Sequence, residues 1–249
     1  MRYLYYAYQL LIAAPLLILA TLLTVVVTVL GSTLGSAHFW GYWPGKLWSR
    51  FFCWILLLPV RVEGREHLAK DTSYVFVANH QGSFDIFLMY GYINRNFKWM
   101  MKRSLRNAPL IGKACESAGH IFVDKRGPKA IQKTYDDARH VLRDGTSLIV
   151  FPEGARTFTG HMGFFRKVAF QLAQEVGLQV VPVTIDGSFD VLPRQRGVSF
   201  ITWHSLRMVI HAPIATEGAE LSTVMDQAYR AIEQSLPEQH QGFVENPDQ

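Results

Sequence analysis

Residues 73–85, SYVFVANHQGSFD, decide the fold class, because an apolar, strand-favouring run changes there into a polar turn and the start of a helix. Residues 73–79 predict a buried strand, and residues 84–93 predict a helix with Ser83 as its N-cap. Further strands are expected at 97–101, 120–123, 147–151, 180–185 and 207–211, and further helices at 110–118, 128–143, 165–176 and 221–236. This alternation predicts an α/β domain with a mainly parallel sheet flanked by helices.

The residues that precede this domain are apolar and predict a membrane-embedded helical segment. Residues 10–30 contain no charged side chain, and a helix of that length would cross the roughly 30 Å hydrocarbon layer. Tyrosines precede this run and Trp40, Trp43 and Trp48 follow it, as is typical of the membrane–water interface. A second apolar run, residues 51–60, is too short to span a bilayer.

Three arrangements of this anchor are open. It is one span with the second run on the membrane surface, a helical hairpin that dips into one leaflet, or a cleaved signal peptide, since Gly35 and Ala37 loosely fit a cleavage site. More Lys and Arg follow the first run than precede it, which predicts that the folded domain faces the cytoplasm, at the inner membrane if the chain is bacterial. We expect an anchor over 1–60, one domain over 61–236 and a frayed polar tail over 237–249.

The composition of the chain excludes several classes of function. Charged residues make up only 18% of the chain, and the first 60 residues contain three basic side chains and no acidic one. This charge suits an anionic lipid surface, and no nucleic-acid partner is expected. Two cysteines exclude a disulfide scaffold and a Cys-rich zinc module, and no histidine pair has metal-ligand spacing, so no metal is expected. The chain also lacks the G-x-S-x-G motif of serine hydrolases.

Polar clusters follow three of the predicted strands, where chemistry collects in open α/β sheets. His80 and Asp85 follow the first strand. On a regular helix they would lie about 140° apart, so they can pair only if the glycine-containing turn folds Asp85 back onto the imidazole. Such a pair can act as a general base. The alternative is a polar strand-end histidine beside an aspartate favoured by the helix dipole.

The other two clusters are candidates for phosphate binding. In FPEGAR, residues 151–156, Arg156 can grip a phosphate and Gly154 allows close approach of backbone N–H groups; the alternative is a surface ion pair between Arg156 and Glu153. The basic residues of the third cluster and of the loop after the second strand are Lys125, Arg126 and Lys102. Each alone is more typical of a solvated charge, but together they predict a phosphate-handling face.

Taken together, the clusters resemble the PlsC-like glycerolipid acyltransferase family, the 1-acyl-sn-glycerol-3-phosphate (lysophosphatidic acid) acyltransferases, over residues 60–193. NHQGSFD holds the family's His-x4-Asp motif. GHIFVDKRG (119–127), FPEGAR (151–156) and VVPVTIDGS (180–188) look like its second, third and fourth blocks, in the family's order. The combination of blocks makes the resemblance specific, whereas His-x4-Asp alone would not.

The resemblance implies a membrane-bound acyltransferase that moves a fatty acyl group from acyl-CoA or acyl carrier protein to the sn-2 hydroxyl of 1-acyl-glycerol-3-phosphate, giving phosphatidic acid. It implies that His80 is the general base, that Asp85 orients it, and that the hydroxyl attacks the thioester directly, without a cofactor. The residues that it implies for acceptor binding are Glu153, Gly154, Arg156, Lys102, Lys125 and Arg126. The family usually has Arg at position 125, so either Lys125 or Arg126 could meet the phosphate.

Other functions stay open beside this one. The acceptor could be another lyso-lipid, such as a lyso-ornithine lipid or a glycolipid. A lipid hydrolase and a non-enzymatic membrane scaffold are the remaining alternatives, although a scaffold would leave the three strand-end clusters unexplained.

Overall fold

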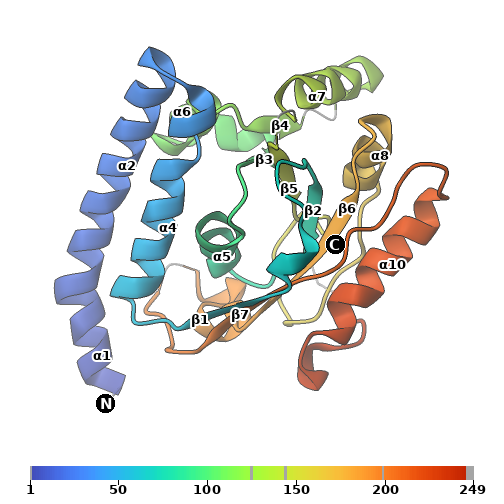
Figure 1. Cartoon of the computed structure of the whole chain (residues 1–249). Helices are drawn as coiled ribbons and strands as arrows, with labels where there is room; N and C mark the ends of the chain where they lie inside the picture. Colours follow the sequence, from blue (N-terminus) through green and yellow to red (C-terminus); the bar gives the residue numbers. More distant parts are fainter. Residues whose placement is uncertain (1, 124–125, 143–144, 198, 245–249) are drawn as a thin grey trace.

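A seven-stranded sheet in the order β1-β7-β6-β2-β5-β3-β4 lies at the centre of the computed structural model, which describes residues 2–123, 126–142, 145–197 and 199–244 (Figure 1). The strands are β1 (Val60–Glu63), β2 (Val75–Ala78), β3 (Phe97–Lys102), β4 (Ile121–Val123), β5 (Ser147–Val150), β6 (Val180–Asp186) and β7 (Leu206–Ile210). Only β6 and β7 pair antiparallel among the described strands. The predicted α/β fold with a mainly parallel sheet is therefore confirmed.

Helices cover both faces of the sheet, so the central strands are buried on both sides. In β2, Phe76 and Ala78 pack on one face, whereas Val75 and Val77 pack on the other. The first face is covered by α4 (Trp43–Ile55) and α5 (Phe84–Tyr92), and the second by α7 (Pro128–Val141), α8 (Val168–Glu175) and α10 (Leu221–Gln234). Each fully buried apolar side chain of this kind contributes about 1.5–3 kcal/mol.

Two predicted helix starts differ from the structure for local reasons. The Ser83 side chain makes no capping hydrogen bond at α5; instead the Asp85 carboxylate accepts one from the Gly82 N–H, at 2.9 Å. The predicted helix at 165–176 begins only at Val168. The Arg166 N–H donates to the Pro152 carbonyl at 3.0 Å, so this segment packs on the loop after β5 before the helix can start.

The N-terminal residues form one long helix that is apolar enough to cross a membrane. It consists of α1 (Arg2–Tyr8), a π-helical turn (Gln9–Ala13) and α2 (Ala14–Leu34). The π turn directly precedes Pro15, which has no N–H to continue the helical ladder. After α3 (Ala37–Trp40), α4 runs back beside α2 (Figure 1). The second apolar run, 51–60, is divided in the structure, since it ends α4 and begins β1.

Both ends of this long helix contact the α/β domain. Near its start, the Gln9 side chain donates to the Ile201 carbonyl at 3.0 Å and accepts from the Ile201 N–H at 2.9 Å. Near its end, α2 packs against α6 (Ile111–Ser117). In between, the Trp48 indole N–H of α4 donates to the Thr21 hydroxyl at 2.9 Å. The helix therefore lies along one side of the domain.

The described part of the tail, residues 237–244, is packed, which corrects the expectation that these residues are frayed. His240 is buried against Gly160, and the Phe243 ring lies 4.3 Å from the Phe164 ring. His161 Nδ1 is 3.0 Å from the Gln241 carbonyl oxygen. Aromatic partners therefore hold residues 237–244 on the loop that follows β5. Residues 245–249 lie outside the described part of the chain.

We expect Asn79→Ala to lower the free energy of unfolding by about 2–6 kcal/mol, because two buried backbone groups, the Ile185 N–H and carbonyl, lose partners that cost about 1–3 kcal/mol each to leave unpaired. The buried Asn79 amide donates to the Ile185 carbonyl and accepts from the Ile185 N–H, both at 2.8 Å, and so joins β2 to β6 beside His80. Denaturant unfolding in detergent measures the change. Asn107→Ala, at an exposed position, is the matched control; an equal loss in both variants would contradict the argument.

Candidate active site

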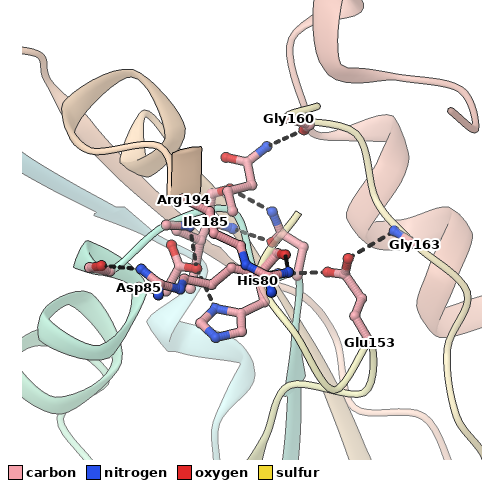
Figure 2. Close-up of polar contacts among 12 residues, drawn as sticks. His80, Asp85, Glu153, Gly160, Gly163, Ile185 and Arg194 are labelled. Carbon is pink, nitrogen blue, oxygen red and sulfur yellow. Dashed lines mark hydrogen bonds and ion pairs between the residues drawn. The ribbon is translucent and has the colours of Figure 1, made fainter. Parts of the chain in front are cut away.

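The turn after β2 brings His80 and Asp85 together. His80 Nδ1 lies 2.7 Å from Asp85 Oδ2, and the carboxylate is fully buried (Figure 2). Gly82 makes this fold-back possible because a Cβ there would lie 2.5 Å from the Ser188 carbonyl oxygen. The pairing that the sequence required of this turn is therefore present.

The hydrogen bond to Asp85 leaves the other imidazole nitrogen available. With Nδ1–H donating to the carboxylate, Nε2 carries the lone pair, and within the described residues it has no hydrogen-bond partner. The His80 ring stacks on Phe151 with ring centroids 3.9 Å apart, and Phe151 in turn stacks on Trp99 at 5.5 Å. These contacts fix the orientation of the ring, so the Nε2 lone pair points in one direction only. Nε2 can therefore accept a proton only from a group on that side.

The Glu153 carboxylate links the ends of two neighbouring strands. Oε1 accepts the His80 N–H at 2.6 Å and Oε2 accepts the Gly163 N–H at 2.8 Å (Figure 2). The side chain is 1% exposed, so the alternative of a surface ion pair with Arg156 is wrong. Burial raises the pKa of Glu153 to about 8, which the two amide donors partly oppose.

Arg156 lies beside the start of α5, next to the His80 turn. Its Nη1 donates to Ser83 Oγ at 2.5 Å, and its own carbonyl accepts a hydrogen bond from Arg194 Nη1 at 3.1 Å. The guanidinium is therefore held within reach of a ligand that would occupy the space beside the His80 ring. Gly154 has a φ of +78°, a left-handed conformation that favours glycine, and its N–H donates to the Phe151 carbonyl.

The remaining predicted basic residues lie further along the same edge of the sheet. Lys102 is the last residue of β3 and is exposed, and Arg126 is exposed after β4. β5 lies between β3 and β2, and neighbouring strands lie about 4.8 Å apart. The backbone of Lys102 is therefore about 10 Å from the backbone at the end of β2. Lys125 lies outside the described residues. The structure thus gathers His80, Asp85, Glu153 and Arg156, and leaves Lys102 and Arg126 to one side.

Several residues of this cluster were not identified as site residues from the sequence. Gln81 donates through Nε2 to the Gly160 carbonyl at 2.9 Å, and the Arg194 guanidinium lies 4.0 Å from the centre of the Phe158 ring. The Gly163 N–H donates to the second oxygen of Glu153. All of these contacts join segments far apart in the chain. Gln81 and Phe151 carried a local signal, because Gln81 lies in NHQGSFD and Phe151 directly precedes PEGAR.

Metal and thiol chemistry have no support in the described residues. They contain no group of three or more His, Cys, Asp or Glu side chains placed to hold a metal ion. Burial raises the pKa of the Cys115 thiol to about 11, which keeps it protonated and a poor nucleophile.

Comparisons with known proteins agree on one family. A family model described as Acyltransferase matches residues 59–186. A chloroplastic 1-acyl-sn-glycerol-3-phosphate acyltransferase from Arabidopsis thaliana is 31% identical over 196 residues, which cover 77% of this chain and 52% of that protein. The Saccharomyces cerevisiae 1-acyl-sn-glycerol-3-phosphate acyltransferase is 28% identical over 215 residues, covering 85% of this chain and 70% of that protein.

The same fold occurs in a solved structure. The crystal structure of PlsC, the 1-acyl-sn-glycerophosphate (LPA) acyltransferase of Thermotoga maritima, matches with a TM-score of 0.61 and 23% identity, covering 88% of this chain and 97% of that one. The chain spans about half the length of the plant and algal relatives that it matches.

We expect Glu153→Gln to lower turnover roughly ten- to a hundredfold, because the new NH2 group must face one of the two N–H groups that the carboxylate accepts. It should also change the pH dependence of stability. A carboxyl whose pKa is raised from 4.5 to about 8 adds stability that is full below 4.5 and is lost as the pH rises through 8. The variant should lack this decline in melting temperature.

Glu217→Gln is the matched control, since Glu217 is exposed and has no hydrogen-bond partner within the described residues. It should leave both turnover and the pH profile of melting unchanged. A Glu153→Gln protein that behaved like this control would contradict the bracing role of the carboxylate.

Proposed function

This chain belongs to the Acyltransferase family, and we propose that it transfers a fatty acyl group from an acyl thioester to the sn-2 hydroxyl of 1-acyl-glycerol-3-phosphate, giving phosphatidic acid. The names of its relatives support this substrate. The observation that carries the chemistry is the 2.7 Å contact between His80 Nδ1 and Asp85 Oδ2, which leaves Nε2 as a base.

The proposed step needs one base and no covalent enzyme intermediate. His80 Nε2 takes the proton of the acceptor hydroxyl while its oxygen attacks the thioester carbonyl carbon. The new C–O ester bond forms, the C–S bond breaks, and the departing sulfur takes the proton back from the imidazolium as a thiol. The buried Asp85 carboxylate stabilises the imidazolium between these transfers. The thiol belongs to coenzyme A or to acyl carrier protein.

We assign recognition of the acceptor phosphate mainly to Arg156. Its guanidinium already lies beside the His80 turn, and a phosphate oxygen can replace the Ser83 hydroxyl as its acceptor. Lys102 and Arg126 add positive charge further along the edge. Both oxygens of Glu153 are already engaged, which supports a positioning role for this residue rather than contact with the acceptor.

Of the three anchor arrangements, we propose the helical hairpin that dips into one leaflet. A helix that crossed the bilayer would place its two ends about 30 Å apart along the membrane normal. Here Gln9 and the C-terminal part of α2 both contact the same domain. Cleavage as a signal peptide would also remove Ala13 and Leu17 from the hydrophobic core. The acceptor and product stay in the membrane, so a shallow anchor brings the site to its substrate.

His80→Ala is expected to reduce acyl transfer by roughly 10²- to 10⁴-fold, the usual contribution of a general base, without changing the melting temperature. The assay uses purified protein in liposomes, labelled acyl-CoA and acyl carrier protein, and a panel of lyso-lipid acceptors. His204→Ala, at an exposed histidine, should keep full activity.

Each result of this assay has a defined meaning. Label in phosphatidic acid that disappears in His80→Ala supports both the reaction and the base. Transfer only to a lyso-ornithine lipid or a glycolipid would correct the acceptor. Release of free fatty acid would favour a hydrolase, and full activity of the variant would refute the base.

Arg156→Ala should raise KM for 1-acyl-glycerol-3-phosphate roughly tenfold to a hundredfold, since a hydrogen bond to a charged group contributes about 1.5–3 kcal/mol. Arg156→Lys should recover only part of this loss, because it keeps the charge without the planar fork. A monoacylglycerol acceptor, which has no phosphate, is the control, and its KM should not change. An unchanged KM for the phosphorylated acceptor would place phosphate recognition elsewhere.

A further inference from the structure

We propose that residues 102–113 form a second membrane contact, separate from the helical hairpin, that docks on anionic lipid headgroups and turns the active edge of the sheet toward the bilayer. We call these residues the docking segment. The proposal deepens the proposed function, on which it rests, by naming the lipid surface at which the enzyme works.

The docking segment exposes large apolar side chains in close succession. It comprises the end of β3, the short helix η3 (Arg103–Asn107), and the start of α6. Leu105 is 46% exposed, Leu110 59% and Ile111 54%. Single exposed leucines are common on soluble proteins, but three within seven residues form a patch that a lipid surface can cover.

Leu110 is held out in a strained backbone conformation. Its φ is +62° and its ψ −54°, and the Ile111 N–H donates to the Pro109 carbonyl at 2.6 Å, which together define a classic γ-turn. A leucine avoids this conformation, and glycine would fit it better. An ordinary surface turn therefore gains nothing from leucine at this position. A turn whose tip inserts into a membrane gains from the apolar side chain.

Basic side chains flank this apolar patch. Lys102, Arg103, Arg106 and Lys113 lie in the segment; Glu116 pairs with Arg106 at 2.6 Å and with Lys113 at 3.7 Å. The surrounding residues 97–142 contain ten Lys and Arg against four Asp and Glu. The residues outside 1–60 and 97–142 have twelve basic and sixteen acidic side chains. An anionic surface therefore attracts this side of the domain and repels the rest.

The segment is continuous with the anchor, which selects a membrane as its partner. α6 packs against α2 (Figure 1). The buried Lys98 ammonium donates to the carbonyls of Ala37, at 3.1 Å, and Ala118, at 2.6 Å, so it ties the α3 turn to the end of α6. Hairpin and docking segment therefore meet the same bilayer. Because β3 ends in the segment, docking turns the strand ends that carry His80 toward the headgroups.

The test measures insertion separately from turnover. The full chain, with Cys53→Ser and Cys115→Ser, carries a fluorophore on Ser104→Cys and is placed in vesicles of phosphatidylcholine alone or with phosphatidylglycerol. We expect quenching by nitroxide-labelled lipid, and faster turnover, only where phosphatidylglycerol is present. Leu110→Gly should reduce both while the melting temperature stays equal or rises, because the γ-turn is relieved.

Charge variants complete the test. Arg103→Glu with Lys113→Glu should weaken docking roughly fivefold or more for each position changed, and Arg230→Glu, an exposed arginine on α10, should leave it unchanged. All of these variants should match the unchanged chain in neutral detergent micelles.

Two outcomes would overturn the proposal. One is equal quenching in both kinds of vesicle, or full quenching in Leu110→Gly. The other is a raised KM for acyl-CoA in neutral micelles, which would assign the cations to a soluble phosphate ligand in the neighbouring groove of about 560 Å³ between α6 and α7. Quenching does not depend on catalysis, so a chain without acyltransferase activity would refute the proposed function alone.

Discussion

The buried carboxylate of Glu153 is the constraint on which the site depends. It accepts one amide from His80, at the end of β2, and another from Gly163, in the loop after β5. The two oxygens of this one side chain thereby hold together the segments that follow β2 and β5, which are neighbours in the sheet but not in the sequence. His80 can then present its ring to Asp85, at the start of α5, and stack on Phe151. Burial makes this carboxyl group costly to ionise.

The fold and the location of the site were predictable because they depend on short-range patterns. Val75, Phe76 and Val77 are apolar in succession, as a strand buried on both faces requires, and polar residues follow directly. In a parallel sheet the carboxyl ends of the strands share one edge, so NHQGSFD and FPEGAR were expected at the same edge, and the pairing of β2 with β5 makes them neighbours. Spacing showed that Asp85 could reach His80 only through a glycine turn, since a helix cannot pair residues five positions apart, but only the structure shows that the turn makes the pair.

What could not be predicted depends on contacts between distant segments. FPEGAR contains a glutamate and an arginine, but only the tertiary structure shows that the first is buried among backbone amides and the second bonds Ser83. Composition predicted a frayed tail. Phe243 instead holds the tail by packing on Phe164, and this contact between distant segments cannot be read from the composition. The apolar run at 51–60 concealed a boundary between α4 and β1, since membrane helix and buried strand draw on the same residue types.

Under the proposed function and membrane arrangement, membrane geometry places a second constraint on this architecture. A base that acts on a lipid hydroxyl must lie at the depth of the glycerol backbone, yet the sheet that positions it is too large and polar at its edges to enter hydrocarbon. A hairpin alone fixes depth and leaves rotation about its axis free. Fixing that rotation requires a further point of contact away from the hairpin, on the side where the strands end. Leu110 occupies such a point, which gives its strained backbone a physical reason.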